Sequence, residues 1–171
     1  AYLIEEPMAA AIGAGINVGE PRGNMVVDVG GGTSDIAVIS LGNIVISESL
    51  RVGGDKFDEA ISRYVRRNYN LAIGEQTSED MKVRIGNCYS RGEVMTMNIR
   101  GRDLVLGLPR EIQITSAGVA EAISEQVQSI VDGIRRVLEL TPPELSADII
   151  EGGVVLTGGG ALLRNLPELV T

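Results

Sequence analysis

The residues with the clearest chemical potential lie in one short stretch, residues 25–40. Two β-branched runs flank Gly30, Gly31 and Gly32, a pattern that predicts strand, tight turn and strand. Glycine has no Cβ and tolerates positive φ, so backbone N–H groups in such a turn can converge on one point and bind phosphate. Asp28, at the mouth of the turn, would repel phosphate unless a cation lay between them, and hydrated Mg²⁺ is the usual bridge. The same glycines could also form a turn without a ligand.

The composition narrows the chemistry further. The chain has 171 residues, of which 44% are hydrophobic, and no segment approaches the apolar length of a membrane span. We therefore expect a soluble globular protein with one core, or one core and a small insertion, and no signal peptide. The single cysteine, Cys88, favours a reducing compartment. Histidine is absent from the sequence, which excludes a Ser-His-Asp triad and any His-ligated metal site.

The net charge of −8 is spread unevenly along the chain. Residues 1–50 sum to −5, residues 51–115 to +2 and residues 116–171 to −5. A mildly basic middle between acidic flanks fits an inserted subdomain, although solvated faces alone could give the same difference. An acidic chain with 3% aromatic residues argues against a nucleic-acid partner.

The stretch before the glycine turn predicts a helix that starts within residues 5–12, with Pro7 in its first turn, and ends at residues 13–15. Residues 2–4 are expected to form a strand, which would place Glu5 and Glu6 at a strand-to-helix junction, a common position for active-site groups. The alternative is that these acidic residues only favour the helix dipole, and for Glu5 we prefer that interpretation.

After the turn, a third β-run at residues 43–49 completes an antiparallel meander. A helix follows with Asp55 as its expected N-cap, and a shorter helix is expected after Thr77. Short exposed strands are predicted over residues 93–115, with a turn at residues 100–103. The apolar stripe of the first of these helices consists of Phe57, Ala60, Ile61, Tyr64 and Val65.

The longest predicted helix begins at a Ser116 cap and stops at residues 141–143, which contain two prolines. A last strand at residues 153–156 then runs into a second triple-glycine turn, Gly158 to Gly160. Here the glycines are expected to precede a helix, whose N-terminus favours anions.

The two glycine turns, with Glu-Pro at a helix start before them, resemble the second half of the actin-like (ribonuclease H-like) ATPase fold. Actins, sugar kinases and heat-shock chaperones share this fold. Essentially the whole chain is similar to the MreB family of bacterial cell-shape proteins. The matching segments are LIEEPMAAAIG (3–13), VDVGGGT (27–33), YVRRNY (64–69), PPEL (142–145) and LTGGGALLR (156–164).

The resemblance implies an α/β lobe with a mixed sheet and an inserted small α+β subdomain. The large subdomain would comprise residues 1–50 and 116–171, and the small one residues 51–115. The family's first phosphate loop, an Asp-x-Gly-Thr hairpin, does not occur in the sequence. The resemblance therefore implies that this chain is a piece of a longer protein and supplies one of the two lobes that enclose the nucleotide.

The resemblance also assigns roles to individual residues. Asp28 would act on Mg²⁺ through water, and Glu6 would position the hydrolytic water. Two departures from the family, Ser34-Asp35 for Thr-Glu and Arg84 for an acidic residue, leave the phosphate site intact. The nucleotide would be bound by Gly30, Gly31, Gly32 and Thr33 at the phosphates, by Gly54 and Asp55 near the ribose, by Glu79 and Lys82 at ribose and adenine, and by Thr157, Gly158, Gly159 and Gly160 at the adenosine.

The implied function is that of an ATP-binding, ATP-hydrolysing cytoskeletal filament protein that scaffolds cell-wall synthesis and rod shape. It would be cytoplasmic, associated with the membrane when polymerised, and partnered by itself and by cell-wall elongation and membrane proteins. Membrane contact would run through the absent half.

Three alternatives stay open beside this interpretation. A sugar or acid kinase and a chaperone ATPase lobe share the fold, but residues 142–145 and 160–164 favour MreB. A dinucleotide-binding turn at residues 155–160 would lack the G-x-G-x-x-G spacing. Lys82 could also be only a surface partner of Glu79, three residues earlier on the same helix.

Overall fold

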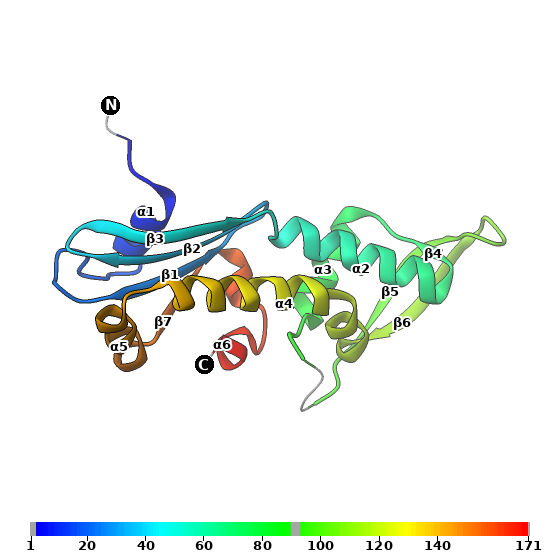
Figure 1. Cartoon of the computed structure of the whole chain (residues 1–171). Coiled ribbons are helices and arrows are strands. Elements are labelled where there is room, and N and C mark those ends of the chain that lie inside the picture. The colour runs from blue at the N-terminus through cyan, green and yellow to red at the C-terminus, as the bar shows by residue number, and fades with distance from the viewer. Residues whose placement is uncertain (1–2, 90–92, 171) are drawn as a thin grey trace. The chain divides into compact units, whose positions relative to one another are not determined.

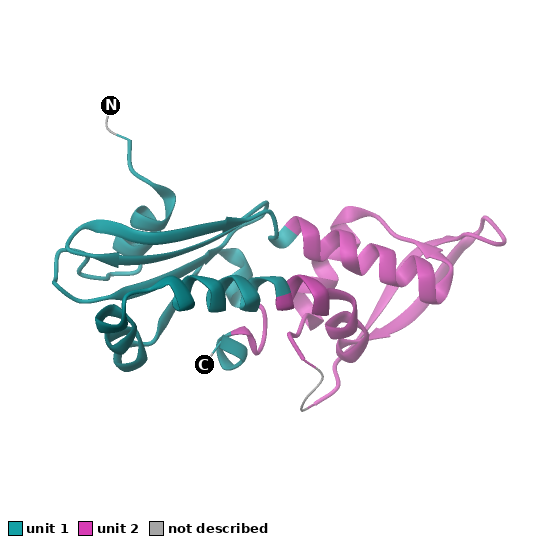
Figure 2. Ribbon diagram, in the orientation of Figure 1, with its two compact units in different colours: residues 1–54, 129–162, 167–171 teal, residues 55–128, 163–166 magenta. Residues whose placement is uncertain are grey.

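The computed structural model describes residues 3–89 and 93–170 and divides the chain into two compact units (Figure 2). Unit 1 comprises Ala1–Gly54, Ser129–Leu162 and Pro167–Thr171, and unit 2 comprises Asp55–Gln128 and Leu163–Leu166. The first boundary between the units falls after Gly54, a few residues beyond the expected boundary after residue 50. The second falls after Gln128, within the long helix, whereas the expected boundary lies at the start of that helix, before Ser116. The assignment of residues 51–115 as an inserted small subdomain, and of residues 1–50 and 116–171 as the large one, stays a prediction.

Unit 1 is built on a four-stranded mixed sheet in the order β3-β2-β1-β7 (Figure 1). The expected hairpin and meander are confirmed, because β1 pairs antiparallel with β2 and β2 pairs antiparallel with β3. The last strand of the chain joins β1 in parallel. The strands are β1 (Asn24–Val29), β2 (Ser34–Ser40), β3 (Asn43–Leu50) and β7 (Val154–Thr157).

Helices cover both faces of this sheet. On one face α1 (Glu6–Gly13) packs Ala11 against Val26, Ala37 and Ile39. On the other face lies the second part of α4 (Ser116–Leu140), where a Cβ added at Gly133 would come within 2.8 Å of methyl groups of Leu50 and Ile36. The chain also forms α5 (Pro143–Gly152), the 3₁₀ helix η1 (Gly159–Leu162) and α6 (Leu166–Val170).

Unit 2 combines a small antiparallel sheet, in the order β4-β5-β6, with helices. The predicted stripe of the first helix is buried at Phe57, Ala60, Ile61 and Val65. Asp55 is not an N-cap as expected, because α2 begins at Gly54 and places Asp55 inside its first turn. The elements are α2 (Gly54–Tyr69), β4 (Leu71–Ala72), α3 (Glu75–Ile85), β5 (Thr96–Asp103) and β6 (Pro109–Thr115).

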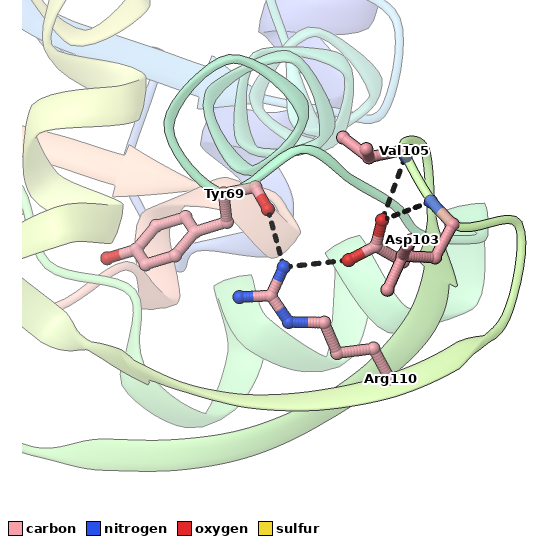
Figure 3. A network of polar contacts seen from close by, with 5 residues as sticks. Tyr69, Asp103, Val105 and Arg110 are labelled. Atoms are coloured by element: carbon pink, nitrogen blue, oxygen red, sulfur yellow. Dashed lines mark hydrogen bonds and ion pairs between the residues drawn. The ribbon is translucent and has the colours of Figure 1, made fainter.

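The prediction of a turn at residues 100–103 was wrong, because β5 continues to Asp103 and the chain reverses over residues 104–108. Gly101 is needed inside the strand, since a Cβ there would collide with Ala72 of the neighbouring β4. Asp103 then fixes the reversal: its Oδ1 accepts hydrogen bonds from the N–H groups of Val105 (2.8 Å) and Leu106 (2.9 Å), as Figure 3 shows.

The other carboxylate oxygen of Asp103 is bound by Arg110. The Arg110 Nη1 donates to Asp103 Oδ2 at 2.9 Å and to the Tyr69 carbonyl at 3.3 Å (Figure 3). The backbone donors Leu106 and Val105, followed by Arg110, hold the pKa of the Asp103 carboxyl below its usual value. Asp103, which was expected within the turn, is thus the last residue of β5, and its carboxylate holds the loop that follows.

The N-terminal cap of α4 is also one residue from the expected position. Thr115 Oγ1 accepts a hydrogen bond from the Gly118 N–H at 3.1 Å, which is the capping contact. Ser116 Oγ instead accepts from the Met95 N–H at 3.0 Å and so ties the helix start to the segment before β5. Within residues 3–89 and 93–170, no helix has the length and apolar character required to cross a membrane.

Candidate functional site

The site in unit 1 is organised around Asp28, the fifth residue of β1. Asp28 is paired with Asp35 on β2 and with Thr157 on β7. Residues paired across neighbouring strands point to the same face, and alternation along β1 puts Asp28 on the face of Val26, which α1 covers. Two carboxylates and a hydroxyl therefore form one row across the sheet.

This row carries an unbalanced negative charge. Like charges directly opposed across strands destabilise a sheet. One oxygen of Asp35 is occupied, because Oδ2 accepts a hydrogen bond from Thr33 Oγ1 at 3.0 Å. Thr157 Oγ1 is buried and has no hydrogen-bond partner among the described residues. A cation beside Asp28, or a polar ligand group beside Thr157, would satisfy these groups.

The first glycine turn is closed by its own backbone. Gly30 N–H donates to the Thr33 carbonyl and Gly54 N–H donates to the Gly30 carbonyl, both at 2.9 Å. None of the three glycines of this turn lies in the left-handed region, so the turn does not use the positive φ that glycine allows. Along the described chain, no hydrogen bond engages the N–H groups of Gly31 and Gly32. These two donors are the part of the turn that can bind phosphate.

The start of α2 is fitted against this turn through Gly53. A Cβ added at Gly53 would lie 2.6 Å from the carbonyl oxygens of both Gly30 and Gly31, which is too close for any side chain. The absent side chain at position 53 thus lets the two backbone segments meet. This contact places Gly54 next to the first glycine turn, whereas its expected position near the ribose stays a prediction.

The second glycine turn lies directly against the end of β1. Gly158 has φ +80°, and a Cβ there would collide with Asp28 Oδ1 and the Val29 carbonyl. A Cβ at Gly160 would collide with the Val29 side chain. The predicted helix after this turn is only the four-residue η1, Gly159–Leu162, which is too short to offer a helix-dipole site. The sheet thus brings Asp28, Thr157 and both turns together.

Glu6 is the first residue of α1 and is exposed. In the described chain its side chain makes no hydrogen bond or ion pair. The strand expected before it is absent at the described residues: Leu3 and Ile4 are exposed and irregular, while Tyr2 lies outside them. The structure places Glu6 on the helix that covers the face of Asp28, but among the described residues no hydrogen bond or ion pair links Glu6 to the glycine turns or to Thr157.

The candidate residues of unit 2 gather around Asp58, which sequence reasoning missed. Lys82 Nζ lies 2.7 Å from Asp58 Oδ2, with both side chains 18% exposed. Burial raises the pKa of the Asp58 carboxyl despite the hydrogen bond and charge of Lys82, and the charges of Glu79 and Asp55 raise it further. The available signal was Asp58 itself, three residues after Asp55 and at the border of the buried stripe of α2.

No group of three His, Cys, Asp or Glu residues able to hold a metal ion together occurs within residues 3–89 and 93–170. A metal at Asp28 would therefore take most of its ligands from water and from a bound anion, which is how Mg²⁺ is usually held.

The fold is that of the actin-like proteins. The structure matches MreB 5 of Spiroplasma citri bound to AMPPNP with a TM-score of 0.90 and 46% identity, covering 94% of this chain and 48% of that chain. It also matches the MamK double helical filament with a TM-score of 0.76 at 23% identity, covering 97% of this chain and 49% of that chain, a likeness that shows the fold alone.

Sequence comparison then defines the family. The model of the MreB/Mbl protein family matches residues 1–171, and the chain belongs to this family. It is 55% identical over 169 residues to the cell shape-determining protein Mbl of Bacillus subtilis and 56% identical to MreB of Escherichia coli K12. These matches cover 99% of this chain but 51% and 49% of the two relatives. The chain thus spans about half the length of the curated relatives it matches.

Proposed function

We propose that this chain acts as the second lobe of an ATP-binding, ATP-hydrolysing filament protein that scaffolds cell-wall synthesis and rod shape. The observation that carries the proposal is the meeting of Asp28, Thr157 and both glycine turns at one end of the unit 1 sheet. Support also comes from MreB 5 of Spiroplasma citri, 46% identical, whose structures are described as bound to AMPPNP and to ADP.

The nucleotide would be held mainly by backbone groups. The N–H groups of Gly31 and Gly32 would bind phosphate oxygens, and the turn that starts at Thr157 would bind the adenosine. Thr157 Oγ1, buried without a partner among the described residues, would gain one from the ligand. In unit 2, Glu79 and Lys82 would bind the ribose and adenine, and Asp55 the ribose.

Asp28 would hold Mg²⁺ through water. The row formed by Asp28 and Asp35 fits a divalent cation, because opposed carboxylates are relieved by positive charge. Bound Mg²⁺ would neutralise charge on the phosphates. Asp28 would fix its waters, while Gly158 packs against the Asp28 carboxylate and restricts its movement.

Glu6 would orient the water that attacks the γ-phosphate, and the glycine-turn N–H groups would stabilise the charge that develops. Hydrolysis would then act as a timer on the polymer. We propose self-association into filaments, a cytoplasmic location with membrane association on polymerisation, and cell-wall elongation and membrane proteins as partners. Membership of the MreB/Mbl family does not favour the sugar-kinase and chaperone alternatives.

The isolated chain tests the two-lobe part of the proposal. It is expected to bind Mg-ATP weakly or undetectably and not to hydrolyse it, because a nucleotide clamp needs both of its halves to exclude water and fix the phosphates. Calorimetric titration with Mg-ATP measures this directly. Micromolar affinity of the isolated chain would show that the site is complete without a first lobe.

The charge at Asp28 gives a second test, in the two-lobed protein, meaning this chain joined to a first lobe that completes the relatives' length. Asp28→Ala is expected to weaken Mg-ATP about 10-fold to 100-fold and ATP without metal far less, since only the metal complex uses the carboxylate. The matched control is Asp132→Ala, which removes an exposed carboxylate of the same unit. Equal losses with and without Mg²⁺ would assign Asp28 to the turn and not to the metal.

A further inference from the structure

The ion pair between Asp58 and Lys82 joins α2 to α3 and differs from the surface pairs of the same unit. Lys82 Nζ lies 2.7 Å from Asp58 Oδ2, and each side chain is only 18% exposed. The pair formed within α2 by Lys56 and Glu59, on either side of Asp58 in the sequence, has side chains 46% and 54% exposed. Water therefore screens the Asp58 pair less, so its geometry is held more firmly.

The pair is nevertheless badly arranged as a stabilising contact. Asp58 Oδ1 is buried and accepts no hydrogen bond from the described residues. A buried acceptor without a partner loses its hydration and gains nothing in return. Asp55 and Glu79, the charged neighbours on the same two helices, add negative charge around it. An ion pair selected for stability would satisfy both carboxylate oxygens.

The titration of Asp58 agrees with this view. Burial, acting against Lys82, raises the pKa of its carboxyl. A raised pKa means that folding favours the protonated form: the stabilisation is present below the ordinary pKa of aspartate and is lost as the pH rises through the raised value. At neutral pH the ionised carboxylate therefore does not favour folding.

We propose that Asp58 is a positioning residue that holds the Lys82 ammonium in place for the sugar and base of the bound nucleotide. This inference rests on the proposed function, in which Lys82 contacts the nucleoside. A lysine ammonium sits on a flexible four-carbon stem, and fixing it before binding lowers the entropy lost when the ligand binds. Asp58 supplies that fixation from the neighbouring helix.

The test compares two ligands in the two-lobed protein. Asp58→Ala is expected to weaken ATP about 10-fold, because Lys82 loses its charged anchor. Inorganic tripolyphosphate, which has no sugar or base, is expected to bind unchanged. Asp58→Asn, which keeps an oxygen that can accept from Lys82 Nζ, is expected to restore most of the affinity for ATP. Glu59→Ala, which breaks the exposed pair with Lys56, is the matched control and is expected to change neither ligand.

A double-mutant cycle with Lys82→Gln separates positioning from structure. In the Lys82→Gln background, Asp58→Ala is expected to cause no further loss of ATP affinity. An unchanged loss in that background, an equal loss for tripolyphosphate, or wild-type affinity in Asp58→Ala would each overturn the inference. If Asp58→Ala does not fold, Asp58→Ser is used in the same cycle, since it is polar but too short to reach Lys82. Failure of the wild type itself to bind ATP would instead overturn the proposed function.

Discussion

Replacing Glu6 by alanine in the two-lobed protein is expected to lower the rate of ATP hydrolysis by about 10²-fold to 10⁴-fold, the usual scale for a positioned acid–base group. ATP binding is expected to survive, because a side chain that only orients water contributes little to the ground-state complex. Glu6 is exposed at the start of α1, where its loss removes no packing from the core. The effect should therefore appear in turnover and not in stability.

The filaments of Glu6→Ala are expected to form and to outlast those of the wild type, because their nucleotide stays ATP. Phosphate release measured beside pelleting or microscopy checks both halves of this expectation. Glu5→Ala is the matched control: it removes the neighbouring carboxylate, for which we propose no catalytic role. Normal phosphate release from Glu6→Ala would show that Glu6 does not orient the attacking water. If neither wild type nor variant formed filaments, the kinase and chaperone alternatives would be favoured instead.

The parts of the fold that local sequence determines were predicted well. The β-branched runs around Gly30 to Gly32 give the hairpin, and the spacing of Phe57, Ile61 and Val65 gives α2. In both cases the signal and the structure depend on residues close together in the chain. The family resemblance then supplied the fold class, which periodicity alone could not.

The errors occurred where distant segments decide the outcome. A turn was expected at residues 100–103, but pairing with β6 on one side, and of Arg102 and Asp103 with β4 on the other, keeps these residues in a strand. The chain reverses only after Asp103, whose carboxylate accepts hydrogen bonds from two backbone N–H groups of the loop. The position of Asp58 at the border of the buried stripe was visible in the sequence, but its ion pair was not, because its partner, Lys82, lies on another helix. The two-residue strand β4 is likewise too short to leave a periodic pattern.

Gly158→Ala is expected to destabilise the two-lobed protein by about 2–4 kcal/mol, one of the largest effects available from adding a single methyl group. A residue other than glycine at positive φ costs about 1–3 kcal/mol, and Gly158 has φ +80°. The new Cβ would also collide with Asp28 Oδ1 and with the Val29 carbonyl, one of which is backbone and cannot turn away. Overpacking of this kind adds about 1–3 kcal/mol.

The same collision predicts a functional loss, because relief of the strain must move either the second glycine turn or the Asp28 carboxylate. Gly158→Ala should therefore also weaken Mg-ATP in the molecules that remain folded. Gly159→Ala is the matched control for stability: the neighbouring glycine has no positive φ and no heavy atom within 4 Å of an added Cβ, so only a small change in the free energy of unfolding is expected. Urea denaturation and calorimetric titration measure the two effects. Equal stability of the Gly158 and Gly159 variants would mean that the turn does not lie against β1, and the meeting of Asp28 with the second glycine turn would then be lost as support for the nucleotide site.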